Sequence, residues 1–146
     1  VGQRRAPGTD PPRTHPMPPP MAVLLLGIAA LLLALGVALL VAPNTAMIVW
    51  PWPLSALTGR AVGAWLAGLG GAAGHAARER DLVRARPVMI GAVVFCALQF
   101  VALARYPGEV AWGTAHAWAY LLFLAVFLAV GALGWYGAQR AGQPQR

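Results

Sequence analysis

The sequence predicts an all-α fold: a polytopic membrane protein built as a bundle of four transmembrane helices. Four long apolar runs fill most of the 146 residues, and none of them contains Asp or Glu. Hydrophobic residues make up 59% of the chain and charged residues 10%, with a mean hydropathy of +0.63. A soluble domain is about 25% charged. The composition therefore indicates that lipid surrounds the folded chain.

The N-terminal part divides into a leader and a first span. Residues 1–20 are rich in Pro and Arg, and we predict a disordered leader because such a segment buries too little apolar surface to order itself. The chain begins with Val, and Met17 and Met21 are candidate starts. The first span is expected over residues 21–42, long enough to cross the hydrocarbon core. A signal peptide is the alternative, but its apolar stretch is usually about 7–15 residues, so we favour an uncleaved helix.

The second span is expected over residues 54–75 and is unusually rich in Gly and Ala. The uncharged segment 43–53 before it holds Trp50 and Trp52 between prolines, a pattern typical of the headgroup zone of a membrane. After it comes the charged segment 78–86, which we interpret as a solvated loop that sets orientation. Contact with anionic lipid or with a cytoplasmic partner is the alternative for this loop.

The remaining spans are expected over residues 87–104, beginning at Pro87, and over residues 114–136. The four-helix domain thus covers residues 21–137, and residues 138–146 form a polar tail. All eleven basic residues are Arg, and they concentrate in the leader, the 78–86 loop and the tail. The positive-inside rule then places both termini and the middle loop in the cytoplasm. Together with the GC-rich codon usage that the composition suggests, this predicts a bacterial inner-membrane protein.

Arg60 is the most unusual residue, because it falls inside a predicted span. Helical spacing places it on one face with Gly63, Ala67, Gly71 and Gly74. Small residues let helix backbones approach closely, so this face is predicted to pack inside the bundle, with Arg60 near its outer mouth. An ionisable residue within a span is a functional candidate. The alternatives are that Arg60 reaches outward to a lipid phosphate or pairs with Glu109.

A set of polar and aromatic residues maps to the predicted outer side and is the candidate ligand site. An ordinary interfacial belt would use the same residue types, so that alternative stays open. If a site exists, it would suit an anionic or amphipathic ligand. Its members are Arg60, Arg105, Glu109, His116, Trp50 and Trp52.

No catalytic, metal or cofactor motif emerges from the sequence. His75 and His116 fall at opposite ends of the predicted bundle, so they cannot share a haem. Cys96 is the single cysteine, which excludes a dithiol mechanism. No carboxylate lies inside a span, although a proton-coupled exporter would need one. The net charge of +7 is explained by basic loops beside a membrane, so we expect lipid partners and no nucleic acid.

The stretch TGRAVGAWLAGLG, with WPWPL before it and LARYPG after the third span, resembles small uncharacterised four-helix bacterial membrane proteins. The layout is similar to that of DoxX-like families over residues 21–137. This resemblance implies the architecture and no activity. We therefore expect a non-enzymatic accessory or scaffold subunit, as a homo-oligomer or within a larger membrane complex. The alternative is a small transporter or a binder of a lipid or quinone near Arg60.

Overall fold

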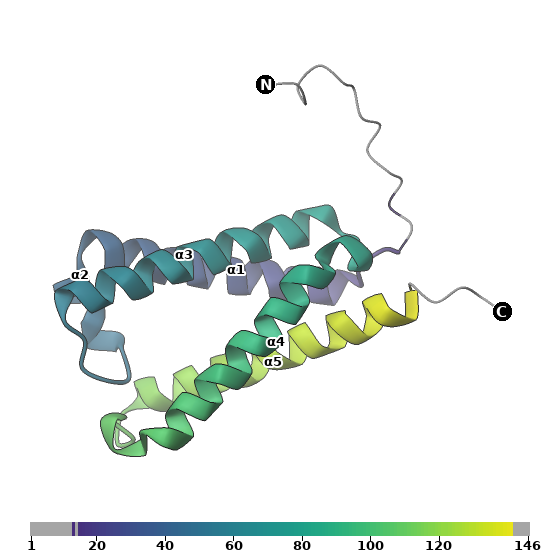
Figure 1. Ribbon diagram of the computed structural model, residues 1–146. Coiled ribbons are helices and arrows are strands. Elements are labelled where there is room, and N and C mark those ends of the chain that lie inside the picture. Colours follow the sequence, from purple (N-terminus) through teal and green to yellow (C-terminus); the bar gives the residue numbers. More distant parts are fainter. Residues whose placement is uncertain (1–12, 14, 142–146) are drawn as a thin grey trace, which may run out of the picture.

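The computed structural model describes residues 13 and 15–141 (Figure 1). Within this part of the chain every regular element is a helix, apart from one isolated β-bridge, so the predicted all-α class is confirmed. The four long helices are α1 (Pro19–Val41), α3 (Ala56–Glu79), α4 (Leu82–Arg105) and α5 (Ala115–Ala141). Short helices connect them: α2 (Pro43–Ala46), η2 (Met47–Val49) and η3 (Pro107–Glu109).

Three of the long helices, α1, α4 and α5, are long and apolar enough to cross a membrane. Helix α3 has 24 residues, which is sufficient length, but it is not among the three. Its Gly-rich sequence, with Arg60 and His75 in it, lowers its hydropathy. Length and composition therefore support three of the four predicted spans and leave the fourth open.

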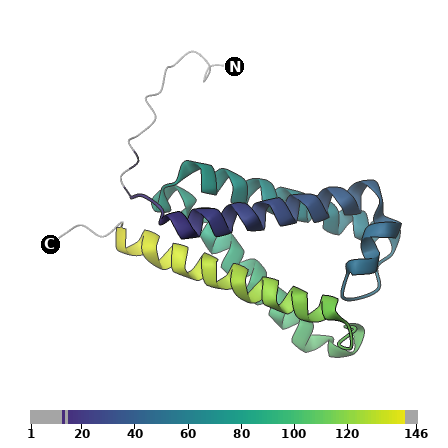
Figure 2. The same ribbon diagram turned by 180° about the vertical axis from the view of Figure 1, so that it is seen from behind.

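The long helices form two hairpins, α1 with α3 and α4 with α5, and each hairpin packs along its length. Contacts between the hairpins are few. Figures 1 and 2 show that the hairpins converge at one end and diverge toward the other. We call these the narrow end, where α3 is followed by α4, and the wide end, where α2, η2 and η3 lie.

The α1–α3 hairpin is held by direct approach of two backbones. A Cβ atom added to Gly36 would lie 2.7 Å from the backbone nitrogen of Ala67, and one added to Gly63 would lie 2.7 Å from the carbonyl oxygen of Gly36. Gly70 meets the backbone of Leu33 at 2.9 Å in the same way. Such close contact is the usual basis of helix association in lipid, where apolar side chains gain nothing by leaving water.

Backbone pairing closes the narrow end. The residue after α3, Arg80, has a φ of 51°, which ends the helix in the left-handed region. The N–H of Met17 donates to the carbonyl of Arg80 (2.9 Å), and the N–H of Leu82 donates to the carbonyl of His15 (2.9 Å). The predicted leader boundary at residue 20 is therefore too late, because residues 15–17 pair with this turn and α1 begins at Pro19. The rest of the leader, residues 1–12 and 14, lies outside the described residues.

Asp81 sets the start of α4 five residues before the predicted third span. Its carboxylate accepts hydrogen bonds from the N–H groups of Val83 (2.9 Å), Arg84 (3.0 Å) and His15 (3.0 Å), and its side chain is buried. This is the arrangement of a helix N-cap. Pro87, the predicted first residue of the span, consequently lies inside α4.

Candidate functional site: a cavity between the hairpins

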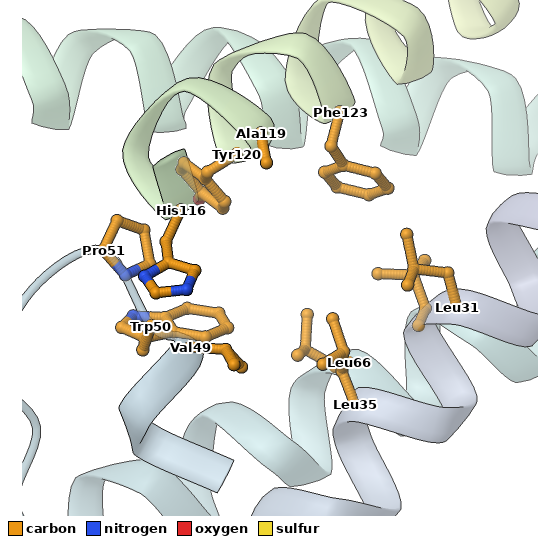
Figure 3. Close-up of a pocket in the computed structure, with 11 residues that line it drawn as sticks. Leu31, Leu35, Val49, Trp50, Pro51, Leu66, His116, Ala119, Tyr120 and Phe123 are labelled. Carbon is orange, nitrogen blue, oxygen red and sulfur yellow. The ribbon is translucent and has the colours of Figure 1, made fainter. Parts of the chain in front are cut away.

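The divergence of the hairpins leaves a cavity of about 250 Å³ toward the wide end. Helices α1, α3 and α5 and the segment after η2 each contribute to its wall. Figure 3 shows apolar side chains at one end of the cavity and the rings of Trp50, His116 and Tyr120 at the other. The lining residues are Leu31, Leu32, Leu35, Val49, Trp50, Pro51, Leu66, His116, Ala119, Tyr120 and Phe123.

An aromatic cluster joins the two hairpins at this end. The ring centroids of Trp50 and Trp52 are 5.3 Å apart in a T-shaped arrangement, and Tyr120 lies 5.9 Å from Trp50 and 5.4 Å from Trp52. These separations are typical of favourable aromatic pairs. The segment carrying both Trp residues is also fixed by its backbone, because the N–H of Ala111 donates to the carbonyl of Pro51 (2.9 Å). Residues 50–53, which we call the Trp-Pro segment, thus link the two hairpins at the wide end.

Two further cavities adjoin the first and share walls with it or with each other. One of about 280 Å³ shares Trp50, Leu66, Tyr120 and Phe123 with it and reaches Trp52 and Gln99. The next, of about 310 Å³, shares Trp52 and Gln99 with the second and extends to Tyr106 and Glu109. We call these three adjacent cavities together the inter-hairpin cavity; their walls extend from the apolar middle of the helices to the turn after α4.

The walls of the inter-hairpin cavity are mostly apolar, and its polar groups lie toward the wide end. The hydroxyl of Tyr120 donates to Oε1 of Gln99 (2.9 Å), which links α5 to α4. The indole N–H of Trp50 is buried and has no hydrogen-bond partner within residues 13 and 15–141. A largely apolar pocket with a few polar groups at one end is the usual form of a site for an amphipathic small molecule.

The structure brings together four of the six residues predicted for a ligand site. Trp50 and His116 line the first cavity, Trp52 lines the second and third, and Glu109 lines the third. Arg60 and Arg105 line none of these three cavities. Both are exposed.

The expectation that Arg60 points into the bundle is wrong for this chain. The face of α3 that contacts α1 runs through Gly63, Ala67 and Gly70, which leaves Arg60 on an exposed flank. No salt bridge joins Arg60 to Glu109 in the described chain.

Of the four residues predicted to pack in the bundle, three lie against α1 and one is exposed. Gly63 and Ala67 meet α1 at Gly36, and a Cβ added to Gly74 would lie at ordinary contact distance from the Cβ of Ala29 (3.6 Å). Gly71 is exposed and has nothing within 4 Å of the place its Cβ would occupy. Helix α3 has small residues on several sides, so the sequence alone could not tell which of them pack.

Sequence reasoning missed the cavity's apolar wall, notably Leu31, Leu35, Leu66 and Phe123. These residues carried no signal, because any apolar residue in a span is expected to face lipid or a neighbouring helix. Gln99, which accepts the hydrogen bond from Tyr120, was not among the predicted site residues. Within residues 13 and 15–141 no group of three His, Cys, Asp or Glu side chains could hold a metal ion.

Comparison of the chain with protein-family models, with curated proteins and with solved structures finds no match. The resemblance to the DoxX-like layout therefore stays a prediction. Function has to be argued from the chemistry of the inter-hairpin cavity, since a helical bundle by itself implies no activity.

Proposed function

We propose that this chain is a non-enzymatic, multi-pass membrane protein that holds one chain of a lipid-type molecule in the inter-hairpin cavity. The observation that carries the proposal is the cavity itself, with an apolar wall inside and aromatic and polar groups at the wide end. An acyl or isoprenoid chain matches the wall, and a polar headgroup matches the wide end. A cavity of about 250 Å³ with a mostly apolar wall suits one such chain better than a polar, water-soluble molecule.

The proposal includes α3 as a fourth span, despite its lower hydropathy. Helix α3 packs along α1 through backbone contacts, and α1 is one of the three apolar helices. A partner lying along a spanning helix shares its depth in the bilayer. Arg60 would then lie about one turn from the start of α3 at Ala56 and reach the headgroup zone along the bilayer surface.

The orientation that we propose places the wide end outside the cytoplasm. The Arg residues of the described chain are more frequent at the narrow end, where Arg78, Arg80, Arg84 and Arg86 lie near the turn between α3 and α4. At the wide end Arg60 and Arg105 are the basic residues of the described chain. This asymmetry supports a cytoplasmic narrow end in a bacterial inner membrane, and the cavity would then open toward the outer leaflet.

Native mass spectrometry of the full chain, released from membranes in a mild detergent, tests the proposal. We expect one bound molecule of lipid mass per chain. Ala119→Trp, which places an indole in the cavity, should abolish the adduct. Ala125→Trp, on an exposed side of the same helix that does not line the cavity, should retain it. If Ala119→Trp binds as the wild type does, or the wild type carries no adduct, the proposal is wrong.

A second candidate function, that of an accessory subunit, is favoured by the exposed side of α3. Cβ atoms added to Gly68 or Gly71 would meet nothing within 4 Å, and Trp65 is 75% exposed beside them. A surface of small residues lets another transmembrane helix approach closely. Gly68→Leu should then disrupt an oligomer or complex on blue native gels while the isolated chain stays folded. An unchanged assembly pattern would exclude this surface as the contact.

A further inference from the structure

The part of the inter-hairpin cavity nearest η3 contains an exposed carboxylate, that of Glu109, for which residues 13 and 15–141 provide no ion-pair partner. Glu109 ends η3 and lines the third cavity. No salt bridge engages it in the described chain, although Arg105 is only four residues away in sequence. The two other acids of the described chain are accounted for, because Glu79 pairs with Arg84 (2.8 Å) and Asp81 caps α4. Glu109 is thus the acidic residue of the described chain whose carboxylate is available to pair with a ligand.

Two aromatic side chains line the same cavity as this carboxylate. Trp52 and Tyr106 line the same cavity as Glu109, and Trp52 is held in position by its contacts with Trp50 and Tyr120. Aromatic faces attract cations, Trp most strongly, and surfaces of this kind recognise ammonium groups. A carboxylate adds direct charge attraction for an ammonium and repels an anionic headgroup. The combination selects for a positively charged group.

The position of this cavity connects the headgroup to the chain. It shares Trp52 and Gln99 with the second cavity, and the second shares Leu66 and Phe123 with the first. A molecule whose head lay at Glu109 could therefore extend its chain toward the apolar wall. On these grounds we infer that the bound molecule is an ammonium-headed lipid, with its ammonium between Glu109, Trp52 and Tyr106. This inference rests on the proposed function, since it identifies the ligand of the same cavity.

The test compares two lipids with identical acyl chains, phosphatidylethanolamine and phosphatidylglycerol, titrated into the detergent-purified full chain by native mass spectrometry. Both carry a phosphate, so the ammonium group is what distinguishes them. We expect wild type to prefer phosphatidylethanolamine by about two- to fivefold, the size of one exposed charge interaction. Glu109→Gln should remove that preference and leave phosphatidylglycerol binding unchanged or slightly stronger. Glu79→Gln makes the same change in net charge at the narrow end and should keep the preference.

The outcomes separate the inference from the function on which it rests. Equal binding of the two lipids by wild type, with both lost in Ala119→Trp, would overturn the ammonium assignment and leave the proposed function standing. If neither lipid binds to wild type, both the ammonium assignment and the proposed function are wrong. Free ethanolamine is a further arm: we expect it not to displace the lipid at equal concentration, because it offers no chain to the apolar wall. Displacement at that concentration would reassign the site to a soluble amine.

Discussion

Replacing Gly63 by Ala is the most direct test of how α1 and α3 are held together. The added Cβ would lie 2.7 Å from the carbonyl oxygen of Gly36, 2.9 Å from the Cβ of Leu39 and 3.0 Å from the backbone nitrogen of Leu40. Ordinary van der Waals contact begins near 3.4 Å, so α1 must move by about 0.7 Å, the difference between 3.4 and 2.7 Å. Two of the three atoms are backbone, and no rotation of a side chain relieves the contact.

The expected magnitude follows from two opposing effects. Overpacking of a close contact costs about 1–3 kcal/mol, whereas Gly→Ala within a helix gains about 0.5–1 kcal/mol. Gly71→Ala is the matched control, because it lies in the same helix with open space around the added Cβ. The helix gain is common to both variants, so the difference between them isolates the overpacking. We therefore expect Gly63→Ala to be less stable than Gly71→Ala by about 1–3 kcal/mol.

The assay is reversible unfolding of the purified chain in mixed micelles, followed by far-ultraviolet circular dichroism as the fraction of denaturing detergent rises. Gly71→Ala should unfold with wild type or slightly later, and Gly63→Ala clearly earlier. Equal midpoints for the two variants would refute the reasoning. So would a loss of stability in Gly71→Ala alone, because that outcome would mean that α3 is rotated relative to α1.

Three further predictions concern the ends of the helices. Asp81→Ala removes a buried cap that accepts hydrogen bonds from three N–H groups, and it should lower the free energy of unfolding by about 1–2 kcal/mol. Ser55→Ala should cost less, because the exposed cap at Ser55 accepts from one backbone N–H. A larger loss in Ser55→Ala would contradict this. Glu79 has its pKa lowered from 4.5, chiefly by the hydrogen bond from Arg84, so its stabilisation is present above pH 4.5 and lost as pH falls through the lowered pKa. The stability advantage of wild type over Glu79→Gln should accordingly shrink on acidification, and a growing advantage would exclude the pairing as its source. Arg60→Lys should match wild type in folding yield while Arg60→Ala falls below both, because an exposed side chain that reaches the headgroup zone needs only a charge on a long stem. If the folding yield of Arg60→Lys is as low as that of Arg60→Ala, a guanidinium-specific contact is indicated instead.

Hydropathy predicted the helices well because it depends on local composition. The expected spans at 21–42 and 114–136 differ from α1 and α5 by a few residues at most ends. The start of the third helix was misplaced because Pro87 is a local signal for a helix boundary, although Asp81, which caps α4 through the N–H groups of Val83 and Arg84, is also a residue type that favours N-caps. The sequence gives no sign of the third hydrogen bond to Asp81, from the N–H of His15, because that residue lies 66 positions earlier in the chain. Pairing of this kind has no signature in composition.

The candidate site was only partly predictable, for the same reason. Trp50, Trp52 and His116 were singled out because aromatic and titratable residues at a membrane boundary are conspicuous. Their assembly around Tyr120 depends on how the Trp-Pro segment crosses between the hairpins. The orientation of Arg60 was predicted wrongly because α3 carries Gly and Ala on several of its faces. The helical periodicity of small residues therefore did not identify the face that packs against α1. The splay of the hairpins, which creates the cavity, is a property of packing between segments far apart in sequence.

The central claim is that one lipid-type chain occupies the inter-hairpin cavity, and photo-crosslinking tests it most directly. The full chain in micelles would be irradiated with a lipid that carries a diazirine in its acyl chain, and the labelled peptides would be mapped by mass spectrometry. We predict saturable labelling at Leu31–Leu35 and Ala119–Phe123, lost in Ala119→Trp and competed by unlabelled lipid. Labelling that spreads evenly over exposed positions such as Leu98 and Leu133, without saturation, would contradict the account.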